Sequence, residues 1–413
     1  MLQRAIALLF LAQCCLLNAQ VGESAKKPAL PQQQPVLAGD PFDARTGIYY
    51  REYHDLFVRD TIPIDFVRTQ RNMDSRSRAF GVGSSTSYDM FIIGDVQKFS
   101  WVALVLADGD QARFSRISPG VSYSDGVFED KSDPSEFLGA VISWNGHGGW
   151  KVKLRDGSEF TVQGCNASSK PGQCAVTEIK RGEGDRLIIQ RDRDGNIVKI
   201  TSPHGHFIDV KTDGAGRIVH AQDDASNWVD YQYDERGRLI RSNNWRHDTQ
   251  VFQYDERSNM ISVRENGPSG RDGGGPYKFE IKNHYDKNDR FSGQFVSNGD
   301  WSSANYQTDT QRRIRQTDLT NPMGSARFFF DEGGATYREE YRIRKQLRWT
   351  LQYRRNPNTH EMLEATLSCG TRKIDIPVSV AMHLAQLGDA HEEYVTRMCK
   401  RSPATKPSTL VGD

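Results

Sequence analysis

Apolar and polar residues alternate along most of the chain with the period of a β-strand. In the stretch VDYQYD, for example, Val229, Tyr231 and Tyr233 share one face of an extended segment, because successive side chains of a strand point to opposite faces. Helical periodicity is nearly absent until residue 378. The pattern predicts an all-β chain of repetitive antiparallel sheet, followed by a small helical segment. The residues that recur in that segment at steps of three and four are Val380, Leu384, Leu387, His391, Val395 and Met398.

One turn pattern recurs at a fixed spacing between these alternating segments. The stretches RDRDGNIVKI, KTDGAGRIVH, QYDERGRLIR and QYDERSNMIS align with their leading aspartates 21 residues apart, at Asp192, Asp213, Asp234 and Asp255. The residues three places later are Gly195, Gly216, Gly237 and Ser258, and looser copies begin at Asp286, Asp309 and Asp331. Asp at the first position and Gly at the fourth are typical of a type I β-turn. We therefore interpret these aspartates as turn residues between stacked strands and not as catalytic groups.

The repeated unit Y-D-x-x-G-R-L, present at residues 233–239, resembles the YD repeat of the RHS-repeat proteins. Residues 39–114 resemble the domain that commonly precedes such repeats, through GDPFDARTG, IPIDFVRTQRN, FGVGSSTSYDM and ADGDQARF, although Ser84 stands where the family usually has Trp. The resemblance implies a β-ribbon of YD repeats. Larger relatives enclose a C-terminal toxin domain preceded by an autoproteolytic D-P-x-G-[LM] motif, which this sequence lacks. The resemblance therefore extends to the fold and not to toxin delivery.

The composition divides the chain into five predicted segments. The start, MLQRAIALLFLAQCCLLNAQ, has a basic residue, a short apolar run and a small residue at Ala19, as a secretory signal peptide does. Lipoprotein processing at Cys14 is the less favoured alternative, because the preceding Gln13 is atypical. The predicted segments are a signal peptide (1–19), a flexible linker (20–38), an RHS-type N-terminal β domain (39–180), YD repeats of about 21 residues (181–355) and a C-terminal hairpin, helix and tail (356–413). We expect an exported chain, periplasmic or extracellular, with no transmembrane segment once mature.

The charge of the chain bears on whether it binds nucleic acid, and its cysteines bear on whether it forms disulfides or binds a metal. The chain has 54 Lys+Arg and 53 Asp+Glu, and Arg4 lies in the predicted signal, so the mature chain is formally neutral. A neutral chain argues against a nucleic-acid partner, which needs a basic face. The cysteines outside the signal are Cys165, Cys174, Cys369 and Cys399. An even number in an exported chain predicts disulfides, with Cys165–Cys174 as a local bridge and Cys369–Cys399 as the other pair. Because the CxxC spacing of zinc sites is absent, we expect no metal and no cofactor.

Few other residues suggest chemistry. His204 and His206 would share one face of an extended segment, with Asp209 nearby, but no further ligand is placed by the sequence, and a polar turn is the favoured interpretation. No nucleophile elbow, H-E-x-x-H pair, phosphate loop or dinucleotide fingerprint occurs. Among the seven tryptophans, Trp245 in SNNWRHD is the best candidate for an exposed ring that stacks on a sugar. The alternative is that these rings pack within the sheet.

These observations leave three functional hypotheses. The leading one is an exported, non-enzymatic scaffold that binds a glycan or an envelope protein. The second is an accessory or truncated component of an RHS toxin system. The third is a polysaccharide hydrolase, which needs two carboxylates roughly 5–10 Å apart.

Overall fold

The computed structural model describes residues 42–95, 97–106, 109, 111–122, 124–131, 137, 139–163, 174–182, 184–266, 279–356, 362–378, 380–381 and 390–400. Every described residue belongs to one compact unit, Gln32–Asp413. The predicted signal peptide, linker and C-terminal tail lie outside the described residues. So do Leu384 and Leu387 of the predicted helical segment.

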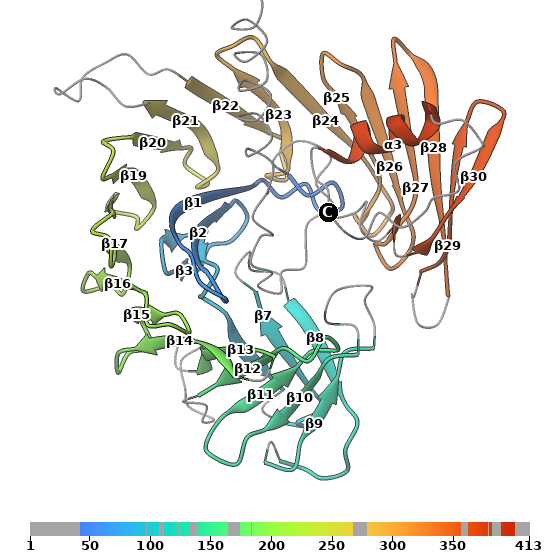
Figure 1. Cartoon of the computed structure of the whole chain (residues 1–413). Coiled ribbons are helices and arrows are strands. Elements are labelled where there is room, and N and C mark those ends of the chain that lie inside the picture. Colours follow the sequence, from blue (N-terminus) through green and yellow to red (C-terminus); the bar gives the residue numbers. More distant parts are fainter. Residues whose placement is uncertain are drawn as a thin grey trace, which may run out of the picture. The chain divides into compact units, whose positions relative to one another are not determined.

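The described residues confirm the predicted all-β fold, with repetitive antiparallel strands and one short helix. A small N-terminal sheet has the order β1–β2–β5, and a two-stranded ribbon, β3–β4, lies in the same stretch of chain. The bounds are β1 (Tyr50–Val58), β2 (Ile64–Arg71), β3 (Ser77–Arg78), β4 (Gly81–Val82) and β5 (Ser84–Thr86). We call residues 42–90, which contain these strands, the N-terminal segment. It contacts the repeat strands that follow later in the chain (Figure 1).

The next eight strands form a ring within one 25-stranded sheet. Each strand pairs with its neighbour from β6 to β13. The ring closes where Phe91, at the start of β6, bridges Ala175 beside β13, and the amide of Val176 donates to the carbonyl of Met90 at 2.9 Å. The bounds are β6 (Phe91–Gly94), β7 (Trp101–Val105), β8 (Gln111–Arg116), β9 (Val127–Glu129), β10 (Val141–Trp144), β11 (Trp150–Lys153), β12 (Glu159–Val162) and β13 (Val176–Arg181).

The repeats continue the same sheet without a break, because β13 pairs with β14 as well as with β12. Every later strand pairs with the next one as an antiparallel hairpin. The bounds are β14 (Asp185–Arg191), β15 (Ile197–Thr201), β16 (Phe207–Thr212), β17 (Ile218–Asp223), β18 (Trp228–Tyr233), β19 (Leu239–Asn244), β20 (Thr249–Tyr254), β21 (Met260–Asn266), β22 (Phe279–Tyr285), β23 (Phe291–Val296), β24 (Trp301–Thr308), β25 (Ile314–Thr320), β26 (Ser325–Phe330), β27 (Thr336–Ile343) and β28 (Gln346–Arg355). One 21-residue unit therefore supplies two strands and two turns.

The two edges of the repeat sheet carry different turns. On one edge, which we call the Asp-turn rim, the pairing register shifts just before each turn, as between Gln232 and Tyr233. On the other edge, the opposite rim, most hairpins keep their register up to the turn. The residue five places after each turn aspartate is buried, and it is usually apolar, as Ile218, Leu239 and Phe291 show. Burying one such side chain contributes about 1.5–3 kcal/mol, so the repeats stack through this row.

The C-terminal elements extend the sheet and cover one of its faces. The predicted hairpin forms β29 (Met362–Cys369) and β30 (Arg372–Ile376), which pair with each other, and β29 also pairs with β28. The helix α3 (Ala390–Lys400) contacts β28, where the indole nitrogen of Trp349 donates to Thr396 Oγ1 at 3.3 Å. The helix therefore packs on a face of the last strands. No helix of the described residues has both the length and the apolarity that crossing a bilayer requires.

Candidate functional site

The Asp turns are built by the aspartate side chain. Asp234 Oδ1 accepts the amides of Arg236 at 3.0 Å and Arg238 at 2.9 Å, and the amide of Gly237 donates to the Asp234 carbonyl at 3.0 Å. The Arg238 Nε donates to the other carboxylate oxygen at 2.7 Å. Burial alone would raise the pKa of Asp234, but the hydrogen bonds from Arg238 lower it below its ordinary value. Gly237 has a φ of 79°, which a glycine adopts at no steric cost.

The same turn geometry recurs at the other sequence-predicted turn residues. The amides two and four residues on donate to one carboxylate oxygen in the turns that begin at Asp192, Asp213, Asp255, Asp286 and Asp309. The residues with positive φ at the fourth position are Gly195, Gly216, Ser258, Asp289 and Arg312. Each of these aspartates therefore holds a hairpin together locally.

In the turns at Asp234, Asp255, Asp286 and Asp309, a tyrosine near the end of the preceding strand joins one repeat to the previous one. Tyr233 Oη donates to the carbonyl of Ile218 at 2.5 Å, and Tyr254 Oη donates to that of Leu239 at 2.7 Å. Tyr285 and Tyr306 repeat the contact, with the carbonyls of Met260 and Phe291. Arg238 lies over the ring of Tyr254 at 5.0 Å and donates to the carbonyl of Asp255 at 2.9 Å. Sequence reasoning missed these contacts, although the recurring Tyr-Asp pair was the signal for them.

The N-terminal segment is fixed to the repeats by a buried arginine. The guanidinium of Arg68 has no exposed side-chain surface and donates to both carboxylate oxygens of Asp55, at 2.8 and 3.2 Å. It also donates to Gln250 Oε1 at 2.7 Å and lies 4.3 Å from the ring centre of Tyr53. Tyr231 Oη donates to Asp55 at 2.8 Å. Burial alone would lower the pKa of Arg68, but the carboxylate of Asp55 raises it above its ordinary value. The charge is therefore retained in the core.

Backbone hydrogen bonds extend this contact along the Asp-turn rim. The amide of Val82 donates to the carbonyl of Gly237 at 3.0 Å, and the amide of Ile218 donates to Ala79 at 2.8 Å. Further along, the amide of Phe291 donates to the carbonyl of Gly47 at 2.7 Å. The N-terminal segment thus pairs with turn residues of several repeats, and it occupies the buried face that they share.

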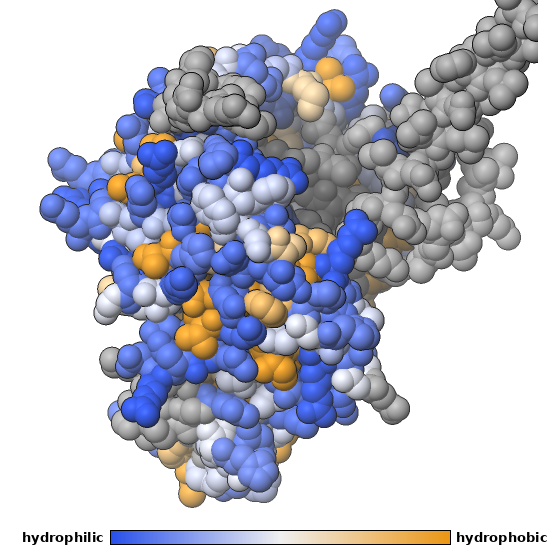
Figure 2. All heavy atoms as spheres, turned by 60° about the vertical axis from the view of Figure 1, so that its left-hand side comes forward, coloured by the Kyte–Doolittle hydropathy of each residue, from blue (hydrophilic) through white to orange (hydrophobic). Residues whose placement is uncertain are grey.

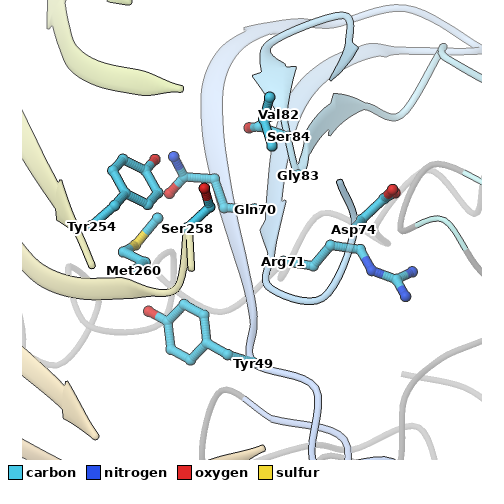
Figure 3. Close-up of a pocket in the computed structure, with 10 residues that line it drawn as sticks. All are labelled: Tyr49, Gln70, Arg71, Asp74, Val82, Gly83, Ser84, Tyr254, Ser258 and Met260. Atoms are coloured by element: carbon cyan, nitrogen blue, oxygen red, sulfur yellow. The ribbon is translucent and has the colours of Figure 1, made fainter. Parts of the chain in front are cut away.

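A small cavity lies within this contact (Figure 3). Its volume is about 10 Å³, and its lining residues are Tyr49, Gln70, Arg71, Asp74, Val82, Gly83, Ser84, Tyr254, Ser258 and Met260. The Gln70 side chain points toward Tyr254 and Ser258, and neither of its amide atoms has a protein partner. A space of this size holds one water molecule, which would satisfy that amide. Small-molecule sites are usually hundreds of Å³ in volume.

The residues considered for a metal site do not come together. His204 Nδ1 lies 2.5 Å from Asp60 Oδ1, His206 Nδ1 lies 2.6 Å from Asp224 Oδ2, and Asp209 Oδ1 pairs with Lys199 at 3.0 Å. Within the described part of the chain, no three His, Cys, Asp or Glu side chains gather as metal ligands. The pairing of His204 with Asp60 instead links the loop after β1 to a repeat turn, and Ser202 Oγ donates to the same carboxylate at 2.5 Å.

Trp245 lies on the opposite rim, and 40% of its surface is exposed. The guanidinium of Arg246 lies 4.6 Å from its ring centre and covers one face of the indole. The surface that includes β16–β20 is mainly hydrophilic, with apolar residues in separate small groups (Figure 2). A ligand that stacks on Trp245 would therefore use the ring face that Arg246 leaves open.

Three of the four cysteines outside the predicted signal peptide lie in the described residues, and all three are disulfide-bonded. Cys369 and Cys399 form a disulfide that joins β29 to α3 across 30 residues. Cys174 is also disulfide-bonded, while its predicted partner Cys165 lies outside the described residues.

Comparison with known proteins gives one family match. Residues 39–114 match a family model. It is described as "Domain of unknown function (DUF6531)" and spans the range that the sequence analysis identified as a domain preceding repeats. No curated protein matches this sequence.

Three solved structures illustrate the level of structural similarity. The crystal structure of TcdB2-TccC3-TEV shares 11% identity at a TM-score of 0.34, over 69% of this chain and 15% of that one. The Photorhabdus luminescens Tc holotoxin pore shares 11% identity at a TM-score of 0.28, over 75% and 22%. A porin-like protein from Bacteroides uniformis shares 9% identity at a TM-score of 0.20, over 73% and 100%. These TM-scores are too low to assign a function to this chain.

Proposed function

We propose that this chain is an exported, non-enzymatic scaffold at the cell envelope, in which the repeats hold the N-terminal segment and present their remaining surface to a partner. The observation that carries this proposal is the buried Arg68–Asp55 pair of the N-terminal segment, which the repeats hold from both sides. Arg68 donates to Gln250 and Tyr231 donates to Asp55, so the pair joins this segment to the buried face of the repeats. A buried ion pair is costly to break from one side. The repeats therefore serve as a rigid support, and a partner has to bind elsewhere.

The use of the acidic side chains supports a non-enzymatic role. A polysaccharide hydrolase needs two carboxylates roughly 5–10 Å apart with the substrate between them. Asp55 is bound by Arg68, Asp65 by His54 at 2.8 Å, and Asp60 by His204 and Ser202. The cavity at Gln70 has room for a water molecule and not for a sugar ring.

A glycan is the partner class that Trp245 favours, because an exposed indole face stacks on the apolar face of a sugar ring. The test is a glycan array with the mature chain, followed by titration of the variants Trp245→Ala and Trp245→Phe. We expect Trp245→Ala to abolish binding and Trp245→Phe to retain most of it, since phenylalanine keeps an aromatic face. No binding on the array, together with tryptophan fluorescence that no sugar changes, would refute the glycan partner.

A second candidate is an accessory component of an RHS toxin system. It is favoured by the 21-residue register of Asp192, Asp213, Asp234 and Asp255, on which the resemblance to RHS-repeat proteins rests. The genes on either side provide the test. A toxin or secretion gene that recurs beside this one in several genomes would support this candidate, and its consistent absence would count against it.

A further inference from the structure

The hairpin that joins β27 to β28 ends in a turn unlike the others on the opposite rim. Ile343 pairs with Gln346, so Arg344 and Lys345 form a two-residue loop. Their φ angles are 48° and 67°. Two successive positive φ angles are the type I′ geometry that Asn-Gly favours. Among the non-glycine residues that the structure describes, these are the only chain neighbours with positive φ. Two long cationic side chains therefore occupy positions where smaller residues would be less strained.

The same hairpin carries a bulge on its return strand. Tyr341 pairs with Trp349 and Arg342 pairs with Leu347, which leaves Arg348 without an opposite residue. A bulge commonly redirects a side chain out of the regular alternation of the strand. Here it adds a third exposed cation next to Arg344 and Lys345.

These three cations differ from the other basic residues of the hairpin. Arg338 and Arg342 both pair with the carboxylate of Glu340. In the described residues, no ion pair or side-chain hydrogen bond involves Arg344, Lys345 or Arg348. We call these three residues, together with Leu347, the basic tip. Its charge is not neutralised by a described neighbour.

Two large apolar side chains accompany the cations. Leu347 is 48% exposed, and Met323, in the neighbouring turn between β25 and β26, is 70% exposed. That turn lies against the base of the hairpin, since a Cβ on Gly324 would meet the carbonyl oxygen of Arg342 at 2.5 Å. The tip thus combines unpaired positive charge with exposed apolar surface at one end of the sheet.

We propose that the basic tip is a docking site for an anionic lipid surface. The cations would contact lipid phosphates, while Leu347 and Met323 would enter the boundary between headgroups and acyl chains. A soluble polyanion would satisfy the three charges but would leave both apolar side chains in water. This combination favours a membrane as the partner, and the site is separate from Trp245 and from any glycan bound there.

The test uses the mature chain and vesicles of phosphatidylcholine with or without phosphatidylglycerol, in a co-sedimentation assay. We expect binding only to the anionic vesicles, and weaker binding at higher salt. The variant Arg344→Asn/Lys345→Gly removes two charges and also supplies the residues that a type I′ turn favours. It should bind about 10–30-fold more weakly while its thermal midpoint stays equal or rises, so a loss of binding cannot be ascribed to misfolding.

The matched control is Lys287→Asn/Arg312→Gly, which removes two exposed cations from the Asp-turn rim and relieves the positive φ of Arg312. It should bind vesicles as the unaltered chain does. Leu347→Ser should weaken vesicle binding without changing binding to heparin. The proposal is overturned if both double variants bind alike, if neutral vesicles bind equally well, or if the chain binds heparin and no vesicles.

Discussion

Replacing the buried Arg68 tests the contact between the N-terminal segment and the repeats most sharply. Arg68→Met keeps most of the volume that packs on Tyr53 but removes both guanidinium donors to Asp55. The Asp55 side chain is 9% exposed, and Tyr231 Oη at 2.8 Å would be its remaining described partner. Leaving one partner of a buried ion pair uncompensated costs about 3–5 kcal/mol. Since whole domains are stable by about 5–15 kcal/mol, this loss should be readily measured.

Urea unfolding of the mature chain, followed by tryptophan fluorescence, gives the free energy. The double variant Arg68→Met/Asp55→Leu removes both charges and should be more stable than Arg68→Met alone, because no buried charge is left unpaired. The control is Arg354→Met, which breaks the exposed pair with Glu364, where the side chains are 60% and 62% exposed. It should leave the midpoint unchanged. The reasoning is refuted if Arg68→Met shifts the midpoint no more than Arg354→Met does.

Gly81→Ala should cost about 2–5 kcal/mol, because φ is 83° and the new Cβ would lie 2.1 Å from the Gly237 carbonyl oxygen; the thermal midpoint of Gly157→Ala, at φ 86° with open space around it, should fall much less. The hydrogen bond to Asp60 raises the pKa of His204 above its ordinary value of 6.5. Burial alone would raise the pKa of Asp60, but the hydrogen bonds from Ser202 and His204 lower it below its ordinary value of 3.8. This contact should therefore stabilise the fold fully between about pH 4 and 6.5. The stabilisation should be lost as the pH rises through the raised His204 pKa or falls through the lowered Asp60 pKa. In Asp60→Asn, NMR titration should show the pKa of His204 back in its ordinary range, and an unchanged pKa would contradict this. Reducing Cys369–Cys399, which closes a 30-residue separation, should cost about 3–4 kcal/mol by the loop-entropy relation; the free energy of unfolding of Cys369→Ser/Cys399→Ser should fall equally, and a change within error would contradict the role of the bridge.

The repeat architecture could be predicted from the sequence because its determinants are local. The aspartate of each turn binds amides only two and four residues away, so Asp234 and Gly237 show the turn in the sequence itself. The alternation around Tyr231 likewise predicts a strand, since one face of the sheet is buried. Because these local interactions repeat at a fixed spacing, the turns and strands that they form can be predicted from the sequence.

The contacts between distant segments could not be predicted in the same way. Arg68 and Gln250 are separated by 182 residues, and Asp60 and His204 by 144. Nothing in the local pattern marks Arg68 as buried, since arginine is usually exposed. The closure of the ring through Phe91 and Ala175 also depends on how strands twist and pair over a long distance. Such contacts follow from the complete fold and not from any short stretch of it.

The most direct measurement of the central claim is amide hydrogen exchange resolved to single residues. The amides of Ile218 and Phe291 belong to the repeats but donate to carbonyls of Ala79 and Gly47 in the N-terminal segment. If the repeats hold that segment as a rigid support, these two amides exchange as slowly as the amides paired within the repeat strands. Fast exchange at Ile218 and Phe291, with the neighbouring strand amides still protected, would show that the segment detaches and would contradict the account.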